Sequence, residues 1–183
     1  MAATVDGKNI VKPAIVLLLV SAVAAMCLGV VSEVTAEPIA IQEKKALDEG
    51  MMAVMPSAAS FEELVDIETS GSVSAAYKAD GGGFVVVTNP NGFNGALGVM
   101  VGVGADGAIT GLRVTSHAET PGLGAKATEP AFYEQFTGAT GEILVTKDGG
   151  EIDSITSSTI TSRAVAVGAT DAVAWVAANG GAY

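Results

Sequence analysis

One uninterrupted apolar run, residues 13–32, constrains the fold of this chain more than any other feature. It reads PAIVLLLVSAVAAMCLGVVS and contains no Asp, Glu, Lys, Arg or His. About 20 apolar residues are what a helix needs to cross the hydrocarbon core of a bilayer. A cleaved signal peptide is the competing interpretation, but its apolar core is usually about 7–15 residues long. The run therefore predicts a retained transmembrane helix.

The charges on either side of the run predict its orientation. Lys8 and Lys12 precede it, whereas nineteen of the twenty acidic residues follow it. Because basic residues next to a span stay in the cytoplasm, residues 1–12 are expected inside and everything after the span outside. The net charge of −11 argues against nucleic-acid binding, since a polyanionic surface repels phosphate backbones. The single cysteine, Cys27, lies inside the run and can form no disulfide within the chain.

Beyond the span, the sequence predicts a juxtamembrane helical segment over residues 33–70 and an α+β domain over residues 71–183. A helix is expected at Ile41–Met55, where Pro56 would end it. Segments rich in Val, Ile and Gly, separated by turn residues such as Asp106-Gly107, favour a mostly antiparallel sheet. The expected strands are Ser72–Ala79, Phe84–Thr88, Ala96–Val103 and Ile109–Thr115, and the expected helices are Pro130–Phe136 and Thr161–Ala178.

A hydroxyl-rich segment, DSITSST at residues 153–159, opens the last predicted helix. Ser157 or Ser158 could cap that helix, whose free N–H groups and dipole favour an anion. Arg163, in the first turns, would add positive charge near a phosphate. An ordinary helix cap without any ligand explains the same residues, so both interpretations stay open on physical grounds.

A second segment, HAETPGLGAK at residues 117–126, follows a predicted strand as a stiff, exposed loop. Its small residues would let a planar ligand lie close to the backbone, with Leu123 as an apolar contact. His117 is the only histidine of the chain, which is too little for a zinc site. We expect it to fix the loop through a hydrogen bond.

Together these two segments resemble the signatures of the FMN-binding domain of Rnf-type electron-transport complexes and their Nqr relatives. HAETPGLG is similar to the HxETPGLG signature, and DSITSSTITS is similar to the flavinylation motif Dxx(S/T)(G/S)AT, in the same order. The pattern from Gly92 to Val103 and the single N-terminal span also resemble the G subunit of Rnf complexes. The resemblance runs from the span to Ala178 and implies one extracytoplasmic FMN-binding domain on a membrane anchor.

The resemblance also implies which residues hold the cofactor. In this family the last threonine of the motif, here Thr159, accepts FMN through its phosphate, and Asp153 opens the sequence that a flavin transferase recognises. Ser158 departs from the usual alanine, and Ser157 stands where glycine is commonest, so Thr156, Ser158 and Thr161 are alternative attachment points. The other cofactor contacts that the resemblance implies are Glu119, Thr120, Gly122, Leu123, Gly124 and Lys126. A Glu119 charge near the flavin ring would lower its potential.

By resemblance, the chain is a redox relay of an ion-translocating ferredoxin:NAD oxidoreductase, and it carries out no substrate chemistry of its own. Its expected partners are integral-membrane and iron-sulfur or flavin subunits. Three alternatives remain: an exported reductase in which FMN feeds a substrate, an anchored scaffold without a flavin, and the C subunit of an Nqr-type complex.

Overall fold

The computed structural model describes residues 7–65 and 67–183 of the chain. They divide into two units between Ala46 and Leu47, so that the second unit extends to Tyr183. The second unit includes residues 47–70, which the sequence placed in the juxtamembrane segment.

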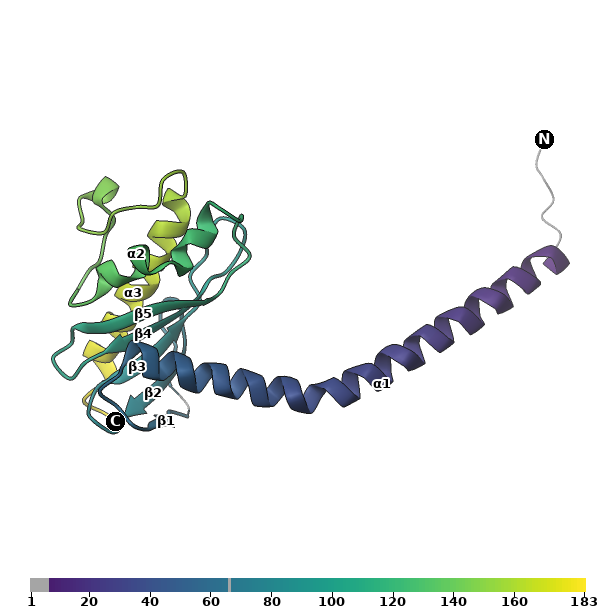
Figure 1. Cartoon of the computed structure of the whole chain (residues 1–183), viewed down its shortest axis with the longest axis horizontal. Coiled ribbons are helices and arrows are strands. Elements are labelled where there is room, and N and C mark those ends of the chain that lie inside the picture. Colours follow the sequence, from purple (N-terminus) through teal and green to yellow (C-terminus); the bar gives the residue numbers. More distant parts are fainter. Residues whose placement is uncertain (1–6, 66) are drawn as a thin grey trace. The chain divides into compact units, whose positions relative to one another are not determined.

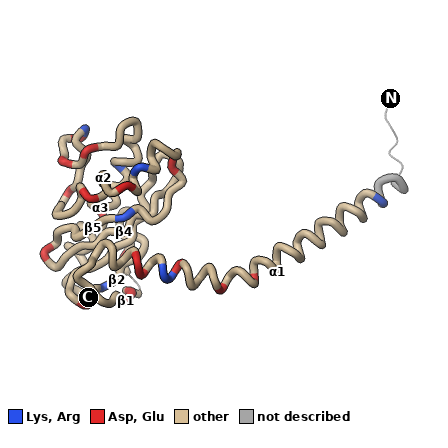
Figure 2. Tube along the Cα trace, viewed as in Figure 1, with Lys and Arg blue, Asp and Glu red and all other residues tan. Residues whose placement is uncertain are grey.

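Helix α1, Gly7–Val54, contains the predicted span. Figure 2 shows its long uncharged stretch, which follows Lys12 and ends at Glu33. The mean hydropathy of its most apolar window is 2.8, and the helix is long enough to cross a membrane. Leu18 and Leu28 are 66% and 71% exposed. A continuous exposed apolar surface of this kind indicates contact with a non-aqueous environment, which agrees with a membrane span.

Two predictions about the segment after the span need correction. α1 continues without a break from the span through Pro38 to Val54, so the helix expected at Ile41–Met55 is its C-terminal part. The helical segment predicted over residues 33–70 ends at Val54, because Met55 and Pro56 begin a turn. A short strand, β1 at Phe61–Glu63, follows within that segment.

The sheet has five strands in the order of the chain, each antiparallel to the next (Figure 1). After β1 come β2 (Val73–Ala79), β3 (Phe84–Thr88), β4 (Gly98–Val103) and β5 (Ile109–Ser116). The α+β fold and the four predicted strands are therefore confirmed. β1 is an addition, and it pairs with the end of β2.

Strand alternation gives the sheet two buried faces. On β3, Phe84 and Val86 point into the larger core, whereas Val85 and Val87 belong to a smaller one. Helix α3, Thr159–Asn179, covers the larger face with the fully buried Trp175. The last turn of α1 covers the other face with Met51 and Val54, and Met55 directly after the helix packs there too.

Between β5 and α3 the chain forms short helices that bring the site segments together. They are η1 (Gly124–Thr128), α2 (Pro130–Tyr133), η2 (Glu134–Phe136) and η3 (Thr146–Asp148). The helix predicted at Pro130–Phe136 is confirmed as the continuous pair α2 and η2. α3 begins at Thr159 rather than at the predicted Thr161, because the chain turns sharply at Ser157 and the Ser162 N–H bonds the Ser158 carbonyl at 3.0 Å.

Candidate functional site

The two segments singled out by sequence border one cavity of about 360 Å³. The loop after β5 contributes Glu119, Thr120, Leu123 and Gly124, and the start of α3 contributes residues 157–161. Phe93, from the loop between β3 and β4, closes a third side. The volume of this cavity is within the range of small-molecule sites.

Glu119 joins all three segments around this cavity. It is 5% exposed, and its Oε1 accepts hydrogen bonds from the backbone N–H groups of Phe93 at 2.8 Å and Asn94 at 3.0 Å. Its Oε2 accepts the Thr161 hydroxyl at 2.7 Å. The loop that His117 was expected to fix is therefore held by Glu119, while His117 lies exposed directly after β5.

These contacts decide the charge state of Glu119. Burial by itself would raise the pKa of this carboxyl group, but the hydrogen bonds from Asn94, Thr161 and Phe93 outweigh it and hold the pKa below its ordinary value. Glu119 is thus an anion at neutral pH, and its two oxygens accept three hydrogen bonds from donors of two other segments.

The glycines of the loop serve two different needs. Gly122 has a φ of +78°, a left-handed conformation that other residues rarely adopt. Gly124 is buried against Glu119, and a Cβ there would lie 2.4 Å from Glu119 Oε2. A side chain at Gly124 would therefore displace the carboxylate that joins the three segments.

A strained turn precedes the other wall of the cavity. Ser157 has a φ of +64°, the only positive value outside glycine in the described chain. Ser158 is the N-cap of α3, but its side chain makes no capping hydrogen bond. Ser162 stabilises this turn instead. Its Oγ accepts a hydrogen bond from the Ile155 N–H at 2.9 Å and donates one to the Ser158 carbonyl at 3.0 Å.

Replacing Ser157 by glycine should stabilise the domain. The left-handed conformation costs a non-glycine residue about 1–2 kcal/mol, and glycine removes this cost. The greater freedom of glycine in the unfolded chain offsets part of the stability gained. We expect the free energy of unfolding to rise by about 0.5–1 kcal/mol in denaturant titrations. Ser154→Gly, at a residue without positive φ, is the control and should destabilise. Equal effects of the two changes would contradict this account.

Thr159 is the first residue of α3, lines the cavity and is half-buried. The ammonium group of Lys147, from η3, donates a hydrogen bond to Thr159 Oγ1 at 2.7 Å. No sequence pattern indicates this contact, because the two residues are joined by a loop without periodicity. Phe93 and Ile160 were not predicted as site residues either; both are exposed at the cavity, by 65% and 51%.

The other motif hydroxyls are placed differently. Thr161 is buried and bonded to Glu119, and Ser158 is only 7% exposed. Thr156 lines a separate cavity of about 250 Å³, together with Asp153 and Lys126. Of the predicted site residues, Asp153, Thr156, Lys126 and Gly122 therefore do not line the cavity that holds Thr159.

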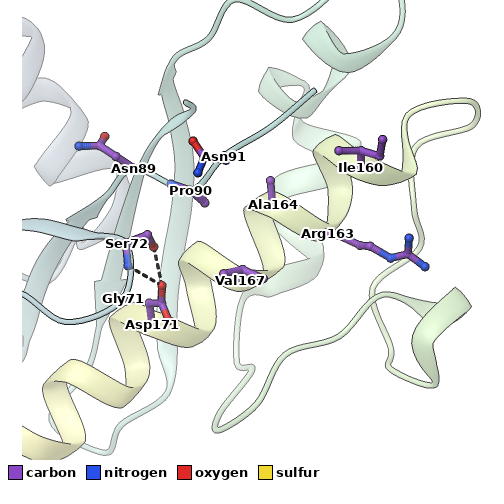
Figure 3. A pocket seen from close by; sticks show the side chains of 10 residues that line it. All are labelled: Gly71, Ser72, Asn89, Pro90, Asn91, Ile160, Arg163, Ala164, Val167 and Asp171. Carbon is purple, nitrogen blue, oxygen red and sulfur yellow. Dashed lines mark hydrogen bonds between the residues drawn. The ribbon is translucent and has the colours of Figure 1, made fainter. Parts of the chain in front are cut away.

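Arg163, which was expected to add charge near a phosphate, has an acidic partner in the structure. Its guanidinium binds Asp148 through two contacts of 2.6 Å, so its charge is already paired. Arg163 lines a different cavity of about 650 Å³ along α3, which Figure 3 shows. At the far end of that cavity Asp171 accepts hydrogen bonds from the N–H and hydroxyl of Ser72, at 2.7 and 2.6 Å.

Comparison with known proteins shows which family the chain belongs to. Residues 92–174 match the family model described as the FMN-binding domain. The chain is 33% identical to the G subunit of the ion-translocating oxidoreductase complex of Methanosarcina acetivorans, over 96% of this chain and 99% of the relative. It is 37% identical to the G subunit of the Na(+)-translocating ferredoxin:NAD(+) oxidoreductase complex of Acetobacterium woodii, over 90% of each chain.

Among solved structures, the chain is similar to the C subunit of the Na(+)-translocating NADH-quinone reductase from Parabacteroides distasonis. The TM-score is 0.47 at 26% identity, covering 57% of this chain and 60% of the other.

The fold, the cavity and the family match define an FMN-binding domain on a chain with one apolar N-terminal helix. The near full-length similarity is more specific than that class. The chain belongs to the family of G subunits of ion-translocating oxidoreductase complexes.

Proposed function

We propose that this chain is the membrane-anchored electron-relay subunit of an Rnf-type ferredoxin:NAD oxidoreductase, with FMN esterified to Thr159. The observation that carries the proposal is the meeting of the two predicted segments at one cavity, which Thr159 lines. A bound flavin supplies reversible electron transfer. The other subunits of the complex are the partners that would deliver and receive the electrons.

The residues of the cavity suit FMN. Phe93, Leu123 and Ile160 are exposed apolar side chains that could contact the flavin ring, whereas Thr159 lies at the N-terminus of a 21-residue helix. The partial positive charge of such a terminus favours a phosphate. A covalent ester would also keep a cofactor made in the cytoplasm from being lost by dilution outside the cell.

Three hydroxyls compete less well than Thr159 for the ester. Thr161 is buried and bonded to Glu119, Ser158 is almost fully buried, and Thr156 lines another cavity. These contacts favour Thr159 as the residue that a flavin transferase modifies. Asp153 and Thr156 lie outside the cavity, which suits residues that the transferase reads rather than residues that touch the flavin.

The test of this function is flavin fluorescence of the denatured wild-type chain, made together with a flavin transferase. We expect a fluorescent band that survives denaturation, because only a covalent flavin migrates with the chain. A dark band, beside a second flavoprotein that the same transferase does modify, would favour the anchored scaffold instead. The C subunit of an Nqr-type complex would also be fluorescent, and it is distinguished by the proteins that copurify with the chain.

We also propose that residues 1–12 are cytoplasmic and the FMN domain is outside. Lys8 and Lys12 before the span, and the acidic residues after it, support this orientation. In a Cys27→Ser background, cysteine at Ala105 should react with an impermeant maleimide in intact cells. Cysteine at Asn9 should react only after the cells are permeabilised. The opposite labelling pattern would reverse the orientation.

A further inference from the structure

We propose that Lys147 binds the phosphate group of the flavin ester on Thr159. This inference rests on the proposed function and adds a cofactor-binding residue to it. Lys147 Nζ already contacts Thr159 Oγ1 at 2.7 Å, and Oγ1 is the atom that would become bonded to phosphorus. The unbridged phosphate oxygens would lie one bond further on, within reach of an exposed and flexible ammonium group.

The charge of the domain favours such a cation. Residues 47–183 contain sixteen acidic and five basic side chains, so an added phosphodiester enters a strongly anionic surrounding. Arg163 is paired with Asp148, and Arg113 lies 4.9 Å from the ring centre of Tyr133. Of the five basic residues, only Lys147 donates to a hydroxyl of residues 156–161 in the described chain.

The neighbouring residue keeps Lys147 in place. Asp148 binds Arg163 with two hydrogen bonds of 2.6 Å, and Arg163 lies four residues after Thr159, one turn further along α3. Residues spaced by four lie on the same side of a helix. This paired contact fastens η3 to the N-terminal part of α3, so the ammonium group of Lys147 stays beside the hydroxyl of Thr159.

The ester forms by phosphoryl transfer, with no change of oxidation state. Thr159 Oγ1 attacks the flavin-bearing phosphorus of an activated donor, such as a flavin dinucleotide. The Oγ1–P bond forms, the bond from that phosphorus to the leaving nucleotide phosphate breaks, and the hydroxyl proton passes to a base of the transferase. Lys147 donates to Oγ1 and so leaves the hydroxyl proton free to depart, and afterwards it neutralises the single negative charge of the ester.

The experiment compares initial rates of covalent loading of the full chain in detergent, with a flavin transferase and a flavin dinucleotide. Lys147→Gln should load about 10-fold or more slowly, the size expected for a lost charge-assisted hydrogen bond. Lys147→Arg should recover most of the rate, because it retains the charge. Lys78→Gln removes one positive charge on β2, outside the cavity, and is the matched control that should load like wild type.

A second readout is independent of the loading rate. Each loaded chain is examined by phosphorus NMR, folded and denatured. The folded wild-type resonance should differ from its denatured position, and Lys147→Gln should lose most of that difference while Lys78→Gln keeps it. An unchanged resonance in Lys147→Gln would overturn the inference even if loading is slow, because Lys147 would then serve recognition by the transferase. Failure of the wild-type chain to load at all would instead overturn the proposed function.

Discussion

Replacing Thr159 by alanine should abolish covalent flavin attachment while the domain stays folded. Thr159 Oγ1 is the motif hydroxyl that accepts a hydrogen bond from Lys147 at the cavity, and alanine offers no oxygen for an ester. We expect wild type to show a fluorescent band after denaturation and Thr159→Ala a dark one, with the loss of one FMN confirmed by intact mass. Because Thr159 is only partly buried at a helix start, unfolding should change by no more than about 0.5 kcal/mol.

Matched variants separate the acceptor from its neighbours. Thr159→Ser keeps a hydroxyl and should retain part of the fluorescence. Ser158→Ala restores the residue usual at that motif position, and the band should stay bright. Thr156→Ala should load more slowly but still give a fluorescent band, since Thr156 lines another cavity and serves recognition by the transferase. A bright Thr159→Ala band with a dark Ser158→Ala band would move the ester to Ser158.

Replacing Glu119 by alanine should destabilise the whole site. The change would leave the N–H groups of Phe93 and Asn94 and the hydroxyl of Thr161 without their shared acceptor. Since a buried donor without a partner costs about 1–3 kcal/mol, we expect the free energy of unfolding to fall by about 3 kcal/mol. Denaturant titration measures this loss. Glu119→Gln keeps an oxygen for the two N–H groups, and it should lose about 1 kcal/mol.

The same pair of variants predicts a pH dependence. The pKa of Glu119 is lower in the folded chain than in the unfolded chain, so its ionised form contributes stability above the unfolded pKa of about 4.3. That contribution is lost as the pH falls through the folded pKa. The stability difference between wild type and Glu119→Gln should therefore be constant near neutrality and shrink below about pH 4. A difference that persists at pH 3 would contradict a charged Glu119.

The Glu119→Gln chain with flavin attached also tests whether Glu119 lowers the flavin midpoint potential. A carboxylate at the cavity disfavours added negative charge on a flavin, so its removal should raise the flavin midpoint potential. An unchanged potential would mean that the three hydrogen bonds to Glu119 already offset its charge.

Much of the fold follows from patterns that a sequence displays locally. The span is an uncharged run, and Phe84–Thr88 is a run of β-branched and aromatic residues between glycine turns. β1 escaped prediction because Phe61-Glu62-Glu63 is short and acidic, and it becomes a strand only through pairing with β2. The start of α3 was displaced by two residues because the left-handed Ser157 was unforeseen; serine there gives no local sign of it.

For the site, the sequence singled out both segments and the family resemblance added the cofactor, but neither predicted the contacts between the segments. The bond from Glu119 to Thr161 spans 42 residues, and the bond from Lys147 to Thr159 depends on the path of an irregular loop. Arg163 illustrates the same difficulty. The sequence predicted it near a phosphate, and the structure pairs its guanidinium with Asp148. Side-chain contacts between irregular loops follow no repeating pattern, so the sequence alone does not predict them.

The order of the strands has a consequence for how the protein matures. Each strand pairs with the strand that precedes or follows it in the sequence, and all five precede Thr159 and α3. The sheet can thus assemble from successive hairpins as the chain emerges, because each pairing is local. The second oxygen of Glu119 receives its partner only when α3 packs against the finished sheet. We therefore expect the flavin to be attached late, so that a yellow chain is one whose folding is complete.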